Sequence, residues 1–553
     1  MLKQFREKFQ SLLGKSAPRA TLQDHGAPPD SGWLERGLAL QRAGRSEEAL
    51  ASFNRAVEAK HDDVEALVGQ AETHIELGHP EDAADCFELA LAFAPDHVPA
   101  LVGLCRLLRG AGAADTALQH IQRALQLAPH DAGLHFESAL THNRCGDTEG
   151  ALAAYQRALE LKPDYAAASV NLGLIHLTQL GDAHRAQWYF ERAIEIEPEA
   201  VAAQANLGLA LQEQGRLDAA LGHYERLIAA HPAVDEYRWN RGIALLSRGD
   251  YARGWEDYEL RNVRGTGAPP RVFPYPVWRG EALAGAALLV YGEQGLGDEI
   301  MFASCVPDLL ERGENCVIEC EQRLAALFER SFPAARVHGA PRDGDRSWLA
   351  RYADIQAQIG IGSLPRLLRR DESEFPRHHG YLRADPQRVA YWRARLAAEA
   401  GGSTVGIAWR GGTLKTGAQL RSLPVPQLAP LFDTPPAFVS LQRGGRDPEL
   451  AALATARGKQ VLFYDEALDD PDEAAALIQA LDGVVTVDST VVHLAGALGQ
   501  RVLLMLPHHA DWRWLRERST SPWYPSARIY RQQQTGDWAS VMAKVAAELR
   551  SWS

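Results

Sequence analysis

One acidic side chain is placed where it could act as a base. Asp298 lies in ALLVYGEQGLGDEIMFASCVPDLL, a stretch that predicts a strand, a turn containing Gly295 and Gly297, and a helix. The helix dipole keeps a carboxylate at such a position ionised, so that it can accept a proton from a substrate hydroxyl. An ordinary helix cap is the alternative interpretation of this aspartate.

The spacing of the glycines around this aspartate argues against common cofactors. Glycines 292, 295 and 297 do not follow the G-x-G-x-x-G spacing of dinucleotide sites, and no G-K-[ST] follows for a nucleoside triphosphate. Asp343 and Asp345 form an isolated Asp-Gly-Asp without the ligand spacing of a metal site, and we interpret it as a loop. We therefore expect neither a metal nor a cofactor.

A second polar group precedes another predicted helix. In GVVTVDSTVVHLAGALG, Asp488, Ser489 and Thr490 lead from a strand into a helix, and His493 follows one turn later. Hydroxyls and free backbone N–H groups converge at such a helix start, which favours binding of a diphosphate.

A basic loop follows a further predicted strand. VGIAWRGGTLKTGAQLRSLP contains Arg410, Thr413, Lys415 and Arg421, which could neutralise phosphates. A solvated basic loop is the other interpretation. Trp512, in DWRWLRERSTSPWYP, offers with Trp514 either a stacking surface for a base or sugar, or a core contact between lobes.

Short apolar strands must position these residues. Strands that alternate with helices predict parallel sheets covered on both faces, and ligands bind at the carboxyl ends of such strands. We assign two α/β lobes, 281–390 and 391–553, with a cleft between them. The expected strands span 287–291, 316–319, 352–356, 405–409, 438–442, 461–464, 484–488 and 502–506.

The first half of the chain is a repeat. Glycines recur at intervals of 34 residues, with one of 35, and rows of small and aromatic residues keep the same step. Each unit predicts a helical hairpin whose first helix ends in a left-handed glycine and whose second helix is closed by proline. The glycines are Gly44, Gly78, Gly112, Gly146, Gly181, Gly215 and Gly249.

This pattern resembles the tetratricopeptide repeat, with seven units over residues 31–262. The resemblance implies an all-α solenoid that binds a peptide or protein. Asn171, Asn206 and Asn240 share one repeat position and could bind a peptide backbone along the inner surface, as a similar asparagine ladder does in protein O-GlcNAc transferases. Local helix contacts are the alternative role of these amides.

Composition narrows the classes of partner. The 553 residues carry a formal net charge of −13, which disfavours nucleic acid as a main partner. The longest apolar run, 282–292, is too short for a membrane span. Residues 1–30 predict an amphipathic helix and a flexible linker without a signal peptide's core, so we expect a cytoplasmic protein, with a membrane-surface helix as the alternative. Residues 263–280 form a Pro/Gly-rich connector.

The blocks of the second half resemble the two-lobed, Rossmann-like GT-B glycosyltransferases, above all the ADP-heptose heptosyltransferases, over about Pro274 to Ser553. The resemblance implies that Asp298 is the catalytic base, that Asp488 contacts donor sugar hydroxyls and that His493 lies in the donor pocket. Arg421 falls on the family's basic residue, whereas Leu423 stands where the family has tryptophan.

Bacterial proteins that fuse such a module to tetratricopeptide repeats, including flagellin glycosyltransferases, resemble the chain more closely. They share GDYARGWEDYELR, PVWRG, YGEQGLGDE, the SLQ that ends at Gln442, and DWRWL. We expect Gln442, Gly295 and Gly297 to belong to the donor-binding site. The resemblance implies a protein O-glycosyltransferase, inverting and metal-independent, that uses a nucleotide sugar and acts on a protein held by the repeats, with flagellin as the named example. The alternatives are a repeat scaffold with a non-catalytic domain, and a heptosyltransferase-like enzyme of surface polysaccharide synthesis.

Overall fold

The computed structural model describes residues 32–262, 271–341, 345–412 and 421–552. Contacts divide the chain into two compact units, Met1–His176 with Arg185–Ala203, and Leu177–His184 with Gln204–Ser553. The predicted N-terminal helix at 1–30, and also Asp343, Thr413 and Lys415, lie outside the described residues.

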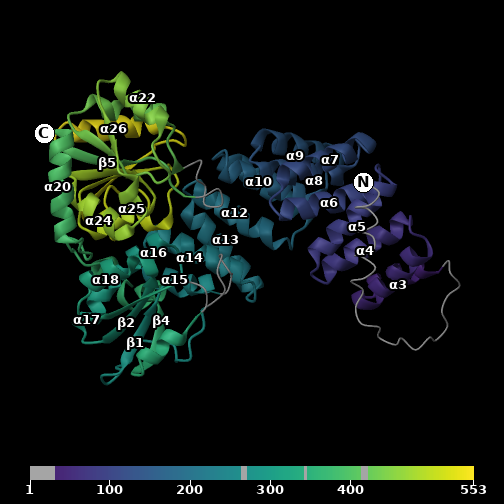
Figure 1. The fold of residues 1–553 in the computed structure, drawn as a ribbon, viewed down its shortest axis with the longest axis horizontal. Coiled ribbons are helices and arrows are strands. Elements are labelled where there is room, and N and C mark those ends of the chain that lie inside the picture. The colour runs from purple at the N-terminus through teal and green to yellow at the C-terminus, as the bar shows by residue number, and fades with distance from the viewer. Residues whose placement is uncertain (1–31, 263–270, 342–344, 413–420, 553) are drawn as a thin grey trace. The chain divides into compact units, whose positions relative to one another are not determined.

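The first unit is built from helical hairpins, as the repeat predicts. Its helices are α2 (Trp33–Arg42), α3 (Ser46–Ala59), α4 (Val64–Glu76), α5 (Pro80–Phe93), α6 (Val98–Gly110), α7 (Ala114–Leu127), α8 (Ala132–Cys145), α9 (Thr148–Leu161), α10 (Ala166–Thr178) and α11 (Ala183–Ile196) (Figure 1). Leu177–His184, which include the end of α10 and the start of α11, belong to the second unit.

Glycine fixes the geometry of these hairpins in two ways. All seven repeat glycines are left-handed, with φ between 67° and 86°, which confirms the predicted helix ends. Other glycines make room for the aromatic row: a Cβ added at Gly69 would lie 2.5 Å from the ring of Phe53. Phe53 in the second helix of one hairpin can therefore pack directly on the backbone of the next hairpin.

The main part of the second unit starts at Gln204, within α12 (Val201–Glu213), and continues with α13 (Leu217–Ala230), α14 (Asp235–Arg248) and α15 (Tyr251–Tyr258). Its last hairpin shares a core with the α/β lobes, because Trp255 and Tyr258 pack against Phe302 and Trp512. The indole N–H of Trp255 also donates to the carbonyl of Arg369 at 2.8 Å. In Figure 1, α14 and α15 accordingly lie beside α16.

The first α/β lobe has a parallel four-stranded sheet in the order β3-β2-β1-β4. Its strands are β1 (Ala287–Tyr291), β2 (Asn315–Glu321), β3 (Arg336–Ala340) and β4 (Ile355–Gly360), and its helices include α16 (Leu296–Phe302), α17 (Val306–Glu311), α18 (Ala325–Ser331) and α19 (Pro365–Leu368). The strand expected at 352–356 starts three residues later than predicted, because Tyr352 ends a preceding 3-10 turn.

The second lobe has a parallel six-stranded sheet in the order β10-β9-β8-β5-β6-β7. Its strands are β5 (Thr404–Ala408), β6 (Ala437–Ser440), β7 (Val461–Phe463), β8 (Gly483–Val487), β9 (Val502–Leu506) and β10 (Ala527–Arg531); its helices include α20 (Pro386–Ala400), α22 (Pro448–Ala456), α23 (Asp465–Leu468), α24 (Pro471–Ala480), α25 (Thr490–Ala497) and α26 (Trp538–Leu549). The predicted all-α repeats followed by two α/β lobes are thus confirmed.

Among the helices of the described part, none has both the length and the apolar character that crossing a bilayer requires.

Candidate functional site

Asp298 is the third residue of α16. The residue that caps this helix is Gly295, so the aspartate does not serve as the ordinary cap considered as an alternative. Its Oδ1 instead accepts a hydrogen bond from the guanidinium of Arg513. The Asp298 side chain is 24% exposed, which leaves the carboxylate accessible to a substrate.

Arg513 is the first link in a chain of alternating charges. Its Nη1 lies 2.6 Å from Oδ1 of Asp511, whose Oδ2 lies 3.6 Å from Nη2 of Arg421. Nη1 of Arg421 in turn lies 3.0 Å from Oδ2 of Asp488. Three residues predicted from separate segments, Asp298, Arg421 and Asp488, therefore belong to one contiguous site that draws on both lobes.

Neighbouring charges in this network of ion pairs shift one another's pKa values. Burial alone would keep Asp511 protonated, but Arg513 and Arg421 hold the pKa of its carboxyl below the usual range. Burial likewise disfavours the charge of Arg513, yet Asp511 and Asp298 outweigh it and raise its pKa. Asp511 and Arg513 thus hold each other in the ionised form. At the far end of the network, burial raises the pKa of Asp488, and Arg421 opposes this shift.

His493 lies in α25, next to the start of α16. Its Nδ1 is 2.8 Å from the hydroxyl of Tyr524, and its ring stacks on Trp514 at 5.7 Å between centroids. A Cβ added at Gly297 would lie 2.9 Å from Cδ2 of His493, so the glycine allows the two helices to approach. Burial lowers the pKa of His493 to about 4, and the ring is therefore neutral at physiological pH.

Because His493 is neutral in the folded protein, we expect the protein to lose stability in acid. The unfolded chain binds a proton below about pH 6.5, whereas folded His493 resists protonation down to about pH 4. The contribution of His493 to the free energy of unfolding should therefore be constant above pH 6.5 and fall by up to about 1.4 kcal/mol per pH unit between these values. In urea unfolding across pH 4–7, His493→Gln should reduce the slope of the free energy of unfolding against pH. The exposed His130→Gln is the control, and an equal slope in both variants would contradict the assignment.

The other residues predicted for the donor site lie at the ends of β5 and β6 and at the start of α25. Gln442 Oε1 accepts from the backbone N–H of Arg410 at 2.9 Å, so it fastens the ends of β5 and β6 together. The Arg410 guanidinium is 55% exposed and pairs with Asp447 at 2.8 Å. Ser489 caps α25 without a side-chain cap bond, and Thr490 is the first residue of this helix. Their roles toward a donor stay predictions.

The two tryptophans of the DWRWL block are core residues. Trp512 is 6% exposed and Trp514 is fully buried. Trp512 packs edge-on against Trp255, with centroids 5.4 Å apart. Of the two interpretations drawn from the sequence, this geometry supports the core contact and not a stacking surface for a base or sugar.

The asparagines of the repeat differ in their surroundings. Asn171 in α10 donates from Nδ2 to the carbonyl of Ala167 at 2.9 Å, which is the local helix contact considered as an alternative. Asn206 in α12 and Asn240 in α14 are half-buried. Asn171 belongs to the first unit and the other two to the second, so a shared ladder stays a prediction.

Sequence reasoning did not assign roles to Arg513, Asp511 and Tyr258. The first two lie between the conspicuous tryptophans of DWRWL, and an Asp-x-Arg spacing carries no specific signal by itself. Tyr258 fits the aromatic row of the repeats, but the structure buries it near Asp298 and Arg513, and burial raises its pKa to about 12. Its hydroxyl lies 3.2 Å from Oε1 of Gln294, in the turn before α16.

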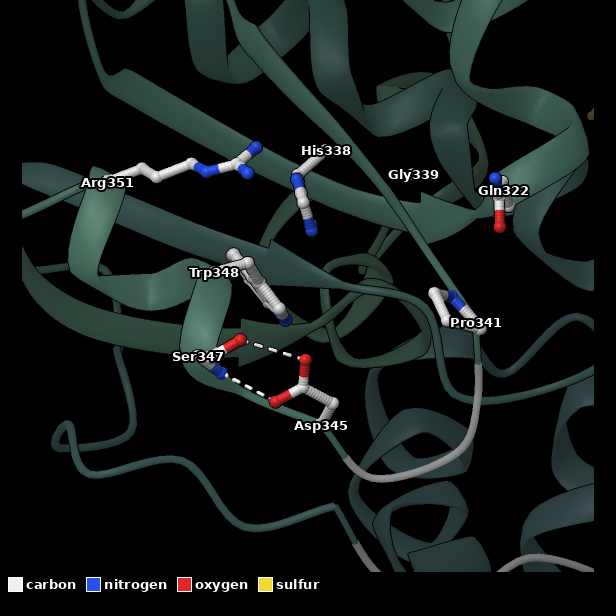
Figure 2. Close-up of a pocket in the computed structure, with 8 residues that line it drawn as sticks. All are labelled: Gln322, His338, Gly339, Pro341, Asp345, Ser347, Trp348 and Arg351. Atoms are coloured by element: carbon white, nitrogen blue, oxygen red, sulfur yellow. Dashed lines mark hydrogen bonds between the residues drawn. The ribbon is translucent and has the colours of Figure 1, made fainter.

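A separate cavity of about 280 Å³ lies in the first lobe, at the carboxyl end of β3 (Figure 2). His338 stacks on Trp348 there, with centroids 4.2 Å apart. Asp345 accepts hydrogen bonds from the backbone N–H and the hydroxyl of Ser347, at 2.9 and 2.8 Å, as the dashed lines of Figure 2 show. None of the predicted donor residues lines this cavity.

Comparisons with known proteins agree with these two halves. Residues 34–98, 68–132, 179–224 and 206–262 match the family described as tetratricopeptide repeat, and 140–179 match a second repeat family. Residues 471–542 match glycosyltransferase family 9 (heptosyltransferase).

Relatives share parts of this arrangement. Protein FlbA of Caulobacter vibrioides is 32% identical over 357 residues, which cover 61% of this chain and 59% of FlbA; the chain thus spans less than two thirds of that relative. Among solved structures, MamA 41-end from Desulfovibrio magneticus RS-1 is 22% identical over 31% of this chain and 97% of its own, with a TM-score of 0.29. A thermophilic repeat protein of Thermus thermophilus, TTC0263, is 25% identical over 33% of this chain and 100% of its own, also with a TM-score of 0.29. The chain thus carries segments that match tetratricopeptide repeats, and residues 471–542 match glycosyltransferase family 9.

Proposed function

We propose that this protein transfers a sugar from a nucleotide-activated donor to a serine or threonine hydroxyl of a protein that the repeats bind. The observation that carries this proposal is the chain of charges from Asp298 through Arg513 and Asp511 to Arg421 and Asp488. It places a carboxylate that can act as a base beside a cation and a second carboxylate that suit a phosphorylated sugar.

In this reaction the acceptor oxygen attacks the anomeric carbon as the bond from that carbon to the donor phosphate breaks. Asp298 takes the hydroxyl proton, and the configuration at the anomeric carbon inverts in the single displacement. Arg513 contacts Oδ1 of Asp298 and orients the carboxylate, so that Oδ2 is the atom that accepts the proton. Arg421 and the backbone at Thr490 stabilise the negative charge of the departing nucleotide. No metal and no cofactor takes part.

The test uses the full chain, a panel of nucleotide sugars and purified flagellin, the acceptor that the sequence resemblance names. We expect one donor to be consumed and the flagellin mass to rise by whole sugar residues, as measured by mass spectrometry. A mutant flagellin without the modified serine or threonine is the control. A chain that binds flagellin but neither hydrolyses nor transfers any donor would instead be a scaffold.

We expect the repeats to contribute to the binding of the acceptor protein and not to the binding of the donor. Replacing Asn171, Asn206 and Asn240 together by alanine removes amides worth about 0.5–1.5 kcal/mol each, so acceptor affinity should fall at least about tenfold with donor affinity unchanged. Gln119→Ala, which removes an exposed amide from a second helix, is the matched control. Titration calorimetry gives both affinities. Unfolding of the triple variant, or unchanged acceptor affinity, would refute the ladder.

A further inference from the structure

Two half-buried arginines, Arg516 and Arg531, lie near the carboxyl end of β10. Arg531, the last residue of β10, is in register with Leu506, the last residue of β9. Arg516 follows in the nearby loop, and its Nη1 lies 3.1 Å from Nδ1 of His509. The Nε atoms of Arg516 and Arg531 are buried and have no hydrogen-bond partner among the residues that the structure describes.

The backbone around Arg516 is strained. Leu515 and Glu517, on either side of it, have φ of 50° and 55°, a region that side chains other than glycine rarely adopt. Arg531 supports this loop by donating from Nη2 to the carbonyl of Leu515 at 2.7 Å. Strain of this kind persists where the surrounding structure holds a side chain in a particular orientation, and it concentrates at binding sites.

The two half-buried arginines carry more positive charge than the neighbouring side chains balance. Burial and the nearby Arg516 lower the pKa of Arg531 to about 10, and burial lowers that of Arg516. His509 accepts from Arg516 and stays neutral, since burial lowers its pKa to about 3. Two carboxylates face Arg516, the exposed Glu517 and Glu213 of α12.

Glu213 balances this charge only in part. Its Oε2 lies 3.6 Å from Nδ1 of His509, and its side chain is 28% exposed. Burial raises the pKa of Glu213 to about 7 although Arg516 and Arg421 oppose the shift, so part of the population is uncharged at neutral pH. Buried guanidinium groups without a full counter-charge attract anions.

We propose that Arg516 and Arg531, with Glu213 at their edge, form an anion subsite that takes a carboxylate or phosphate group of a substrate. The subsite is separate from Asp298 and adjoins Arg421, which faces the same Glu213. β10, which ends at Arg531, is separated by β9 from β8, which leads to Asp488. This position at the carboxyl edge of the same sheet suits a group attached to the sugar side of a donor. This inference rests on the proposed function only in assigning the anion to a substrate.

Titrations of the full chain test the subsite at constant ionic strength. Inorganic phosphate and glucuronate serve as anionic probes and glucose as the neutral one. We expect both anions to bind and glucose not to bind. Arg516→Gln should weaken anion binding at least tenfold, and Glu213→Gln should strengthen it several-fold, because it removes a competing carboxylate. Arg518→Gln removes the same charge two residues away, where Arg518 pairs with Glu372, and is the matched control.

The two variants are expected to change anion affinity in opposite directions, and this distinguishes a binding site from a cluster with only a structural role. Equal anion affinity in the wild type, Arg516→Gln and Glu213→Gln overturns the inference, as does equal weakening by Arg518→Gln. Tighter binding of phosphate than of glucuronate assigns the subsite to a phosphate, and the reverse order assigns it to a carboxylate. Anion binding that follows this pattern in a chain that turns over no nucleotide sugar would refute the proposed function and leave the subsite standing.

Discussion

Asp298→Asn is expected to lower the rate of sugar transfer by about 10²–10⁴-fold, because the amide cannot accept the hydroxyl proton. The asparagine oxygen can still accept the hydrogen bond that Arg513 donates to Oδ1, so the surrounding charges should keep their positions. Donor affinity, measured by calorimetry, should therefore stay within a few-fold of the wild-type value. A loss in kcat without a loss in donor binding is the signature of a group that acts in the transition state.

The control for this variant is Glu311→Gln, which neutralises an exposed carboxylate in α17 of the same lobe. It should leave transfer unchanged. Turnover of Asp298→Asn at the wild-type rate would mean that Asp298 only anchors Arg513. A parallel loss of donor affinity would mean that the aspartate orders the donor pocket instead of acting as the base.

The fold was largely predictable because local chemistry repeats along the chain. Gly44 and its six counterparts have left-handed backbone conformations, and they mark the end of the first helix in every hairpin. The buried strands were visible as apolar runs, whereas β3 and β10 were missed. Both lie at a sheet edge, and their sequences, RVHGA and ARIYR, carry the polar residues that edge positions tolerate.

Individual candidate residues could be singled out from the sequence, but not the network of ion pairs that joins them. Helix starts and strand ends singled out Asp298, Arg421 and Asp488, each with a plausible structural alternative. Their connection depends on Asp511 and Arg513, which are neighbours in the second lobe. Arg513 reaches Asp298 of the first lobe only when the two lobes pack together. Ion pairs between residues far apart in the sequence leave no periodic signal. In DWRWL, the two tryptophans offered the more obvious functional interpretation, as a stacking surface for a base or sugar.

The last hairpin has a packing role that the repeat period does not predict. The repeat spacing continues through Tyr258, so the sequence predicts a solenoid up to residue 262. Nevertheless Trp255 and Tyr258 pack on Phe302 and Trp512, in the core that supports α16. A truncation designed to isolate the α/β lobes must therefore keep α14 and α15, because removing them would expose these aromatic side chains.

Arg261→Met is expected to destabilise the second unit by about 3–5 kcal/mol, the cost of leaving a buried ionic partner without its counter-charge. Arg261 is 1% exposed, and its Nη2 lies 2.6 Å from Oε1 of Glu293, whose side chain is 6% exposed. The same guanidinium binds Glu259 at 2.9 Å and the hydroxyl of Ser363 at 2.6 Å. Methionine replaces the aliphatic volume but none of these hydrogen bonds.

The double variant Arg261→Met with Glu293→Gln separates charge from packing. Removing the stranded carboxylate should restore part of the lost stability, as measured by urea unfolding. Arg253→Met is the matched control, because Arg253 and Glu225 form a pair in which both side chains are 50% exposed, and its loss should cost at most about 1 kcal/mol. Equal losses in Arg253→Met and Arg261→Met would show that the buried pair is not what joins the last repeat to the turn after β1. Because that turn leads directly to Asp298, a true anchor should also lower transfer in Arg261→Met at temperatures where the variant is still folded.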